Sequence, residues 1–197
     1  VVINPDVYEI PIESGPNIES CVGSGVEFFE ESSVISIEAE DYTHCLHGLW
    51  QAIDSQWVFD SEIAGYHGEG YVVANPDVKV KMEDTTDGPR LGYNITFSNS
   101  GNYTIWLRMS APSGGSDSVH VGLNGLPITY GYGASAQTGD SWNWINSSGW
   151  VGGEKIQLEV FVPSEGQHQL HIWMREDGVR IDSIIMTNIA GFDPENA

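Results

Sequence analysis

Basic residues are scarce in this 197-residue chain. Seven Lys and Arg stand against 28 Asp and Glu, which gives a formal net charge of −21. No basic residue precedes Lys79, so the acidity is steepest in the first part of the chain. A field of this sign repels nucleic acid and anionic membranes, and we expect neither as a partner. It also weighs against a polyanionic substrate, although solubility in a salty medium is an equally good reason for the charge.

Long apolar runs are also lacking. The longest extend over a few residues, such as Ile184–Met186, whereas a membrane-spanning helix needs about 20. We therefore expect no membrane span. Hydrophobic residues still make up 40% of the chain, which indicates a folded domain. The length suits one hydrophobic core and a flanking segment.

The sequence contains none of the common catalytic signatures. There is no Gly-x-Ser-x-Gly elbow and no phosphate-binding loop. His44 and His47 lie near Cys45 but have no second Cys/His pair at zinc spacing. Glu38 and Glu40 would share one strand face and could not flank a glycosidic bond from two sides. We expect a non-catalytic protein, with a small hydrolase or lyase as the weaker alternative.

Cysteine is limited to Cys21 and Cys45. Two cysteines permit a single disulfide, which in a secreted protein would tie the N-terminal segment to the domain. Two buried thiols are the alternative. The number of cysteines does not fix the compartment.

No segment of ten or more residues has a convincing helical period, and short alternating strands are present instead. Asn124-Gly125 is a strong hairpin signal, because both positions tolerate positive φ. Many short strands at this spacing predict an all-β sandwich or barrel. The expected strands are Val34–Glu40, Leu91–Phe97, Tyr103–Met109, Ser118–Leu123, Leu126–Tyr130, Ile156–Val162, His168–Met174 and Arg180–Thr187.

The expected domain organisation has three parts. Residues 1–33 are rich in Pro, Gly and acidic residues and are predicted to be an acidic, mostly irregular leader or linker, although Val7–Ile10 could form a short strand. Residues 34–190 are predicted to form the sandwich. Residues 191–197 would be a C-terminal tail.

Three carboxylates are candidate metal ligands. Glu38 and Glu40 are two apart on a strand, so they point the same way, with Cα atoms about 6.5–7 Å apart. Asp182 lies in an otherwise apolar strand and needs a partner there. If the first and last strands are neighbours, the three converge and suit Ca²⁺. A solvated edge strand with two ordinary glutamates is the alternative.

Aromatic residues beside polar ones are candidate ligand-binding residues. A sugar ring has an apolar face that an aromatic plane can cover, and a rim of hydroxyls that polar side chains can bond. Packing in the core is the alternative for each aromatic residue. In two expected loops the candidates are Tyr66, His67, Trp142, Asn143 and Trp144.

A charged turn supplies further candidates. Glu176, Asp177 and Arg180 lie within five residues, and they could hydrogen-bond a hydroxyl-rich ligand. They could equally form a solvated turn with weak internal ion pairs.

Four short motifs occur in an order that is similar to one known family. They are Ile37–Tyr42, Ser100–Arg108, Gly166–Leu170 and Ile181–Ile184. Together they resemble the family six and family thirty-five carbohydrate-binding modules attached to glycoside hydrolases, over about residues 35–187.

This resemblance implies a jelly-roll sandwich of galactose-binding-like type with a structural calcium ion held by Glu38, Glu40 and Asp182. It also implies a sugar site in loops at one end, with Tyr66 or His67 as one aromatic platform and Trp142 or Trp144 as the other. The family often has Asn where this chain has Arg180.

We therefore expect a secreted, non-catalytic module that binds a polysaccharide, at chain ends or internally. A neutral galactan such as agarose is the expected ligand. The module would hold an attached glycoside hydrolase, part of the same parent chain, near its substrate. A structural or adhesive sandwich without a sugar ligand is the alternative.

Overall fold

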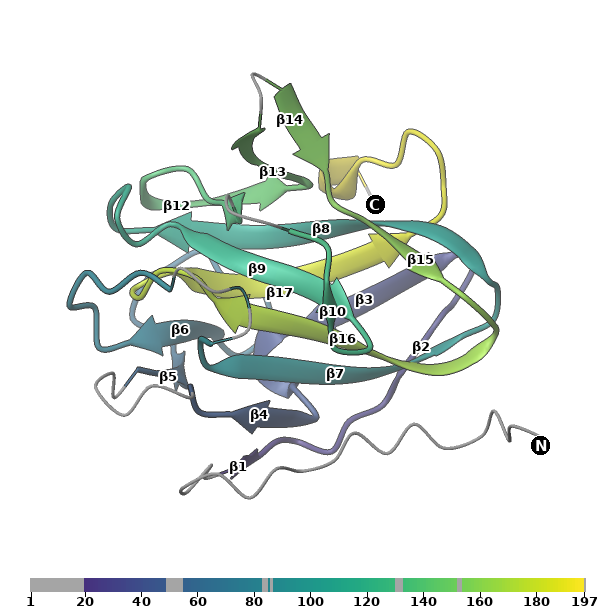
Figure 1. The fold of residues 1–197 in the computed structure, drawn as a ribbon, viewed down its shortest axis with the longest axis horizontal. Helices are drawn as coiled ribbons and strands as arrows, with labels where there is room; N and C mark the ends of the chain where they lie inside the picture. The colour runs from purple at the N-terminus through teal and green to yellow at the C-terminus, as the bar shows by residue number, and fades with distance from the viewer. Residues whose placement is uncertain are drawn as a thin grey trace, which may run out of the picture.

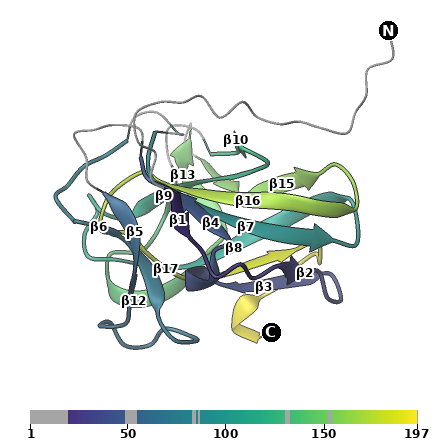
Figure 2. The same cartoon turned by 90° about the horizontal axis from the view of Figure 1, so that it is seen from below.

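The computed structural model describes residues 20–48, 55–82, 85, 87–129, 133–151 and 154–196. They form an all-β sandwich of two sheets (Figures 1 and 2). The only helical segments in this part of the chain are two 3-10 turns, η1 (Ala39–Asp41) and η2 (Pro194–Asn196). No helix in it is long and apolar enough to cross a bilayer. The predicted all-β sandwich is confirmed.

Within the described residues, the first sheet has ten strands and the second has seven. The ten-stranded sheet runs in the order β1 (Ser20–Val22), β4 (His44–Leu46), β7 (Arg90–Phe97), β16 (Gly166–Met174), β9 (Ser118–Leu123), β11 (Ala134–Ser135), β13 (Ser147–Val151) and β14 (Glu154–Gln157), with β2 (Phe28–Phe29) beside β7 and β10 (Leu126–Pro127) beside β9. The seven-stranded sheet runs β12 (Gly139–Ile145), β8 (Gly101–Ala111), β17 (Arg180–Thr187), β6 (Tyr71–Asn75) and β5 (Gln56–Asp60), with β15 (Glu159–Val162) beside β8 and β3 (Val34–Glu38) beside β17.

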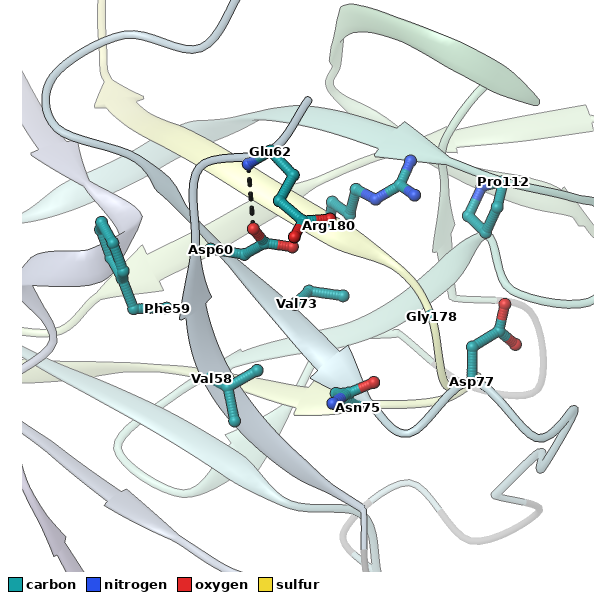
Figure 3. Close-up of a pocket in the computed structure, with 10 residues that line it drawn as sticks. All are labelled: Val58, Phe59, Asp60, Glu62, Val73, Asn75, Asp77, Pro112, Gly178 and Arg180. Carbon is teal, nitrogen blue, oxygen red and sulfur yellow. Dashed lines mark hydrogen bonds between the residues drawn. The ribbon is translucent and has the colours of Figure 1, made fainter. Parts of the chain in front are cut away.

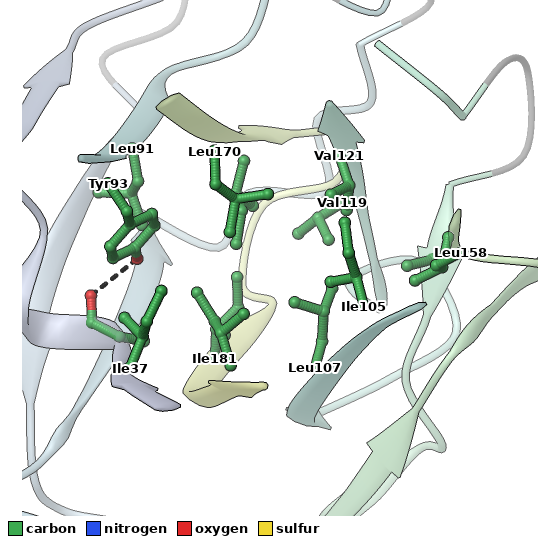
Figure 4. Close-up of a cluster of buried hydrophobic side chains, with 14 of the residues drawn as sticks. Ile37, Leu91, Tyr93, Ile105, Leu107, Val119, Val121, Leu158, Leu170 and Ile181 are labelled. Carbon is green, nitrogen blue, oxygen red and sulfur yellow. Dashed lines mark hydrogen bonds between the residues drawn. The ribbon is translucent and has the colours of Figure 1, made fainter. Parts of the chain in front are cut away.

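The core lies between the two sheets and follows directly from the alternation of the strands. In β8, Tyr103, Ile105, Leu107 and Met109 are fully buried, and the residues between them point outward. Figure 4 shows Ile105 and Leu107 beside Ile181, facing Leu91, Val121 and Leu170 of the other sheet. Strand β8 therefore has one face in the core, and its opposite face is left for other roles.

The expected strands are largely confirmed. The hairpin at Asn124-Gly125 forms as predicted, with φ values of 51° and 80°. Its second strand ends at Pro127, and Tyr130 lies outside the described residues. Val34–Glu40 is strand only to Glu38, after which the 3-10 turn η1 begins. One interpretation was wrong: the expected loop at Gly139–Trp144 is strand β12.

The chain crosses between the sheets at two neighbouring points. It leaves the seven-stranded sheet at Asn146, between β12 and β13, and returns at Leu158, between β14 and β15. Leu158 N donates to Asn146 O at 2.7 Å, and Leu158 O accepts from Ile105 N at 2.8 Å. The expected single strand Ile156–Val162 is thus divided between the two sheets at Leu158.

Part of the expected leader belongs to the sandwich. Strand β1 pairs with β4, and β2 runs parallel to β7. The Glu30 carboxylate accepts hydrogen bonds from Ser98 N at 2.7 Å and Asn99 N at 3.1 Å, at the turn that follows β7. Cys45 is disulfide-bonded, and the register places Cys21 directly opposite it. The possible strand Val7–Ile10 lies outside the described residues.

Candidate functional site

Most of the predicted site residues gather on the outer face of the seven-stranded sheet. Glu38 on β3 lies opposite Ser183 on β17, Ser183 lies opposite Arg108 on β8, and Arg108 lies opposite Trp144 on β12. These positions alternate with core residues, so the strand geometry turns the whole row outward. Predicted site residues from strands that are far apart in the sequence therefore meet on one surface.

Arg108 and Asp182 form the centre of this surface. Asp182 is wholly buried, and Arg108 Nη1 donates a short hydrogen bond to its Oδ2. His67 N donates to Asp182 Oδ1 at 2.9 Å, and Ser183 Oγ donates to Oδ2 at 3.1 Å. A buried carboxylate is stable only with such partners. The sequence correctly predicted that Asp182 needs a partner, and in this structure the partner is a guanidinium.

Three aromatic side chains pack beside this ion pair. The ring of Trp142 lies 5.1 Å from that of Tyr71, centroid to centroid, and Tyr66 lies 6.0 Å from Tyr71. Trp142 Nε1 donates to Ala64 O at 3.2 Å, and the Arg108 guanidinium lies 5.8 Å from the Trp142 ring centre. Tyr71 is fully buried, whereas Trp142 and Tyr66 are half-buried. The structure therefore brings together two of the predicted platforms over a buried third ring.

The remaining predicted residues of this region lie around the aromatic group. His67 is exposed, and its Nδ1 is 3.4 Å from Ser183 Oγ. Trp144 is half-buried on β12. Asn143, on the same strand, donates through its Nδ2 to Ser141 O at 3.0 Å.

A pocket of about 430 Å³ opens on the same face (Figure 3). Val58 and Val73 supply apolar surface, and the polar lining comes from carboxylates, an amide and Arg180. Arg180 Nη1 donates to Asp140 Oδ1 at 2.9 Å. The lining residues are Val58, Phe59, Asp60, Glu62, Val73, Asn75, Asp77, Pro112, Gly178 and Arg180.

Tyr71 connects the pocket to the aromatic group. Burial raises the pKa of the Tyr71 hydroxyl, and its contact with the Asp60 side chain raises it further. The same hydroxyl accepts a hydrogen bond from Ile63 N at 3.2 Å. Since Asp60 lines the pocket, the buried Tyr71 side chain links the aromatic rings to the polar pocket from beneath the surface.

Glu38 and Glu40 lie side by side against the loop at Gly68. A Cβ atom at Gly68, which has φ +60°, would lie 3.2 Å from Glu38 Cδ and 3.2 Å from Glu40 Oε1. Burial raises the pKa of both carboxyls, and their neighbouring negative charges raise it further. Glu40 Oε1 accepts from Gly70 N at 3.1 Å, whereas Glu40 Oε2 is buried without a hydrogen-bond partner.

These two glutamates fit a hard cation, because they offer paired carboxylate oxygens and one oxygen without a partner. Asp182, the third expected ligand, already has its oxygens bonded to Arg108, His67 N and Ser183. Accordingly, no group of three or more His, Cys, Asp or Glu side chains in the described segments is arranged to hold a metal ion. Any calcium site here would rest on Glu38 and Glu40, with further oxygens from elsewhere.

The structure gives Glu176 and Asp177 a different role from the predicted one. Asp177 is fully buried and accepts from Val78 N at 2.7 Å and Val80 N at 3.0 Å. Glu176 is buried and accepts from Ser118 Oγ at 2.7 Å and from Arg175 Nη1 at 3.0 Å. Their oxygens bond the protein itself, so these carboxylates hold neighbouring loops in place.

Sequence reasoning missed Arg108 and the acidic pocket residues as parts of the site. Arg108 was visible as the charged outward position of an alternating strand, but its neighbour Asp182 is 74 residues away. The pocket residues Asp60 and Asn75 end two strands, β5 and β6, that were not predicted.

The fold defines the class of protein. A family 35 carbohydrate-binding module from Clostridium thermocellum superposes with a TM-score of 0.54 at 16% identity, over 79% of this chain and 98% of that one. The GH26-CBM35 β-(1,4)-mannanase of Podospora anserina gives 0.53 at 20% identity, over 83% of this chain and 29% of that one. The predicted resemblance to carbohydrate-binding modules of this type is confirmed as a resemblance of fold.

The sequence identifies the family within that class. The family model of the glycosyl hydrolase family 115 C-terminal domain matches residues 27–190, and the chain belongs to this family. A relative from Formosa agariphila, described as uncharacterized protein P23, is 25% identical over 198 residues. The alignment covers 88% of this chain and 48% of the relative, so the chain spans about half of that protein.

Proposed function

We propose that this domain is a non-catalytic carbohydrate-binding module that recognises a polysaccharide on the outer face of its seven-stranded sheet. The observation that carries the proposal is that Trp142 and Tyr66 pack on Tyr71, whose hydroxyl contacts Asp60 of the polar pocket that Arg180 also lines. Aromatic rings cover the apolar face of a sugar, and carboxylate, amide and guanidinium groups bond its hydroxyls. The fold and the family membership support the same function.

The ligand that we propose is a neutral galactan such as agarose. The net charge of −21 favours a neutral chain over a polyanion. The proposed role is to hold the catalytic part of a secreted family 115 glycoside hydrolase close to its substrate, which raises the local concentration of cleavable bonds. The family membership supports this association.

The proposal includes a structural calcium ion held by Glu38 and Glu40. Bound Ca²⁺ supplies the positive charge that offsets the repulsion between two half-buried carboxylates. The raised pKa of both groups and the unpartnered Glu40 Oε2 support it. These residues also touch the loop at Gly68, two residues from Tyr66, so an ion here would steady the loop that carries the aromatic ring.

The test is affinity electrophoresis through gels that contain agarose, xylan or β-glucan, each with Ca²⁺ and with a chelator. We expect retardation in agarose that weakens when the chelator is present. Retardation only in xylan or β-glucan would keep the binding function and correct the ligand. Free migration of the folded protein through every gel would exclude the proposed function and favour a structural or adhesive sandwich.

A further inference from the structure

Three connecting segments meet at one side of the pocket. Pro112 begins the loop between β8 and β9, Asp77 lies in the segment that follows β6, and Gly178 lies in the turn between β16 and β17. Figure 3 shows these three residues on the same side of the pocket. Gly178 approaches Asp77 closely, since a Cβ atom at position 178 would lie 2.6 Å from Asp77 Cγ. The shape of this side of the pocket therefore depends on how the three segments hold together.

Hydrogen bonds attach the segment after β6 to both of its neighbours. Ser116 Oγ, in the loop between β8 and β9, donates to Asp77 Oδ1 at 2.9 Å, and Lys79 Nζ donates to Ser116 Oγ at 2.8 Å. On the other side, the buried Asp177 carboxylate accepts from the Val78 amide at 2.7 Å. The position of Asp77 is thus coupled to the β8–β9 loop and to the β16–β17 turn.

The β8–β9 loop and the β16–β17 turn also meet directly, through two carboxyl groups. The half-buried Asp117 side chain is within hydrogen-bonding reach of the Glu176 carboxylate, and Asp117 N donates to Glu176 Oε2 at 3.3 Å. We call Asp117 and Glu176 the acid pair. Carboxylates are acceptors only, so two carboxyl groups bond each other only when one of them carries a proton. The contact between loop and turn therefore requires a shared proton.

The charges around the acid pair do not replace that proton. Arg175 Nη1 donates to Glu176 Oε1 at 3.0 Å. In the segment after β6, Lys79 bonds the Asp77 carboxylate at 2.8 Å, and Lys81 pairs with Glu176 through the backbone. With both members of the acid pair ionised, two negative charges would face a guanidinium that Glu176 already binds. Like charges at this separation in a half-buried site repel each other strongly.

We infer that the acid pair is a pH switch: it holds this side of the pocket together while it keeps the shared proton, and it lets the β8–β9 loop move away when both carboxyls are ionised. The proton is lost to solvent and regained from it. Movement of the loop would displace Pro112 and, through Ser116, Asp77. Only the effect on sugar binding rests on the proposed function, because the opening itself needs no ligand.

The electrostatics of the acid pair place the switch near neutral pH. Burial, together with the hydrogen bond to Glu176 and its negative charge, raises the pKa of Asp117 to about 7. Burial opposes ionisation of Glu176 as well, but hydrogen bonds from Ser118 and Asp117 outweigh it and lower the pKa of Glu176. The shared proton therefore belongs to Asp117. An open loop, in which Asp117 has an ordinary pKa, would be about tenfold more favoured at pH 8.5 than at pH 6.

The first part of the test uses the whole 197-residue chain without sugar. Amide hydrogen exchange, followed by nuclear magnetic resonance, gives the protection factor of the Asp117 amide, which loses its acceptor when the loop moves. After correction for the intrinsic pH dependence of exchange, we expect this protection to fall about tenfold between pH 6 and pH 8.5. The amide of Leu158, between β14 and β15, should keep its protection. Unchanged protection at Asp117 would overturn the inference.

Two variants separate the acid pair from other titrating groups. Asp117→Asn carries no charge and can still donate to Glu176, so protection at position 117 should differ by less than about twofold between the two pH values. Glu165→Gln, which removes an exposed carboxylate between β15 and β16, should respond as the unaltered protein does. If Asp117→Asn does not fold, the carboxyl carbon resonance of Asp117 in the unaltered protein decides, and it should titrate near pH 7. A response that persists in Asp117→Asn, or titration of Asp117 below about pH 5, would contradict the switch.

The second part measures retardation in agarose gels at the same two pH values. The affinity of the unaltered protein should fall by about fivefold or more at pH 8.5, because only the closed loop completes the pocket, and that of Asp117→Asn should stay constant. Equal retardation at both pH values would show that the switch does not control the pocket. Free migration through agarose, xylan and β-glucan at both pH values would count against the proposed function, and the exchange of the Asp117 amide would then decide on the switch alone.

Discussion

The two outer faces of the sandwich differ in whether their arginines are paired with a carboxylate. On the seven-stranded sheet, Arg108 and Arg180 are bonded to Asp182 and Asp140. On the ten-stranded sheet, Arg90 has no carboxylate partner among the described residues. Where the chain supplies the counter-charge, the guanidinium becomes part of a scaffold that supports aromatic rings and a polar pocket. Where it does not, the guanidinium is left without a counter-ion in the described part of the chain.

The largest expected effect comes from breaking the scaffold of the seven-stranded face. Asp182→Ala leaves the Arg108 charge without its buried partner, and we expect a loss of about 3–5 kcal/mol in the free energy of unfolding. Urea denaturation measures it. Asp140→Ala, which breaks an exposed pair on the same face, should cost less than about 1 kcal/mol. Equal losses in the two variants would contradict the scaffold role of Asp182.

The second largest effect is expected from calcium, whose proposed ligands lie only on the seven-stranded face. At about a hundred times its Kd, Ca²⁺ should raise the free energy of unfolding by about 2.7 kcal/mol, and chelation should reverse the gain. Glu40→Gln should remove the response, because it takes away the orphaned carboxylate oxygen. Thermal unfolding with Ca²⁺ and with Mg²⁺ is the measurement. An equal shift in Glu40→Gln, or none in the unaltered protein, would remove calcium from the proposal.

A third prediction concerns the aromatic surface of the seven-stranded face. Trp142→Ala should weaken polysaccharide binding by about 2 kcal/mol, or roughly 30-fold, since a central aromatic anchor typically contributes this much. Phe161→Ala is the control, because Phe161 is 66% exposed on β15, away from the pocket. Retardation in affinity gels gives both affinities. A folded Trp142→Ala protein with full affinity would place the sugar elsewhere.

The smallest effect probes the ten-stranded face through pH. The pKa of His171 is lowered to about 3, against 6.5 for an ordinary histidine, so below pH 6.5 the unfolded chain takes up a proton that the folded ring does not. The free energy of unfolding should therefore fall between pH 7 and pH 5, by at most about 1.4 kcal/mol per pH unit from this residue. His171→Phe and His171→Gln should both flatten the decrease in urea unfolding. An unchanged slope in both would show that His171 is not responsible.

The sequence predicted the strands more reliably than the contacts of their outward side chains. Alternation found β7 and β8, because the period-two pattern of a strand with one buried face is local information. The expected convergence of Glu38, Glu40 and Asp182 depended on the first and last strands being neighbours, and β3 and β17 do pair.

What the sequence could not provide was the identity of partners that are distant along the chain. The Asp182 carboxylate has Arg108 as its counter-ion, and the backbone donors that occupy Asp177 come from residues 78 and 80. Whether an outward charge faces solvent, a ligand or another side chain depends on sheet order, which a single strand does not encode. Arg90 shows the same limit, because nothing in its local sequence distinguishes it from the paired arginines.

The two neighbouring crossovers at Asn146 and Leu158 have a consequence for local opening of the fold. Because they are hydrogen-bonded to each other and Leu158 is bonded to β8, separation of the two sheets at this edge requires these backbone bonds to break together. Partial unfolding should therefore start elsewhere, and the amides of Leu158 and Ile105 should exchange with deuterium about as slowly as global unfolding permits.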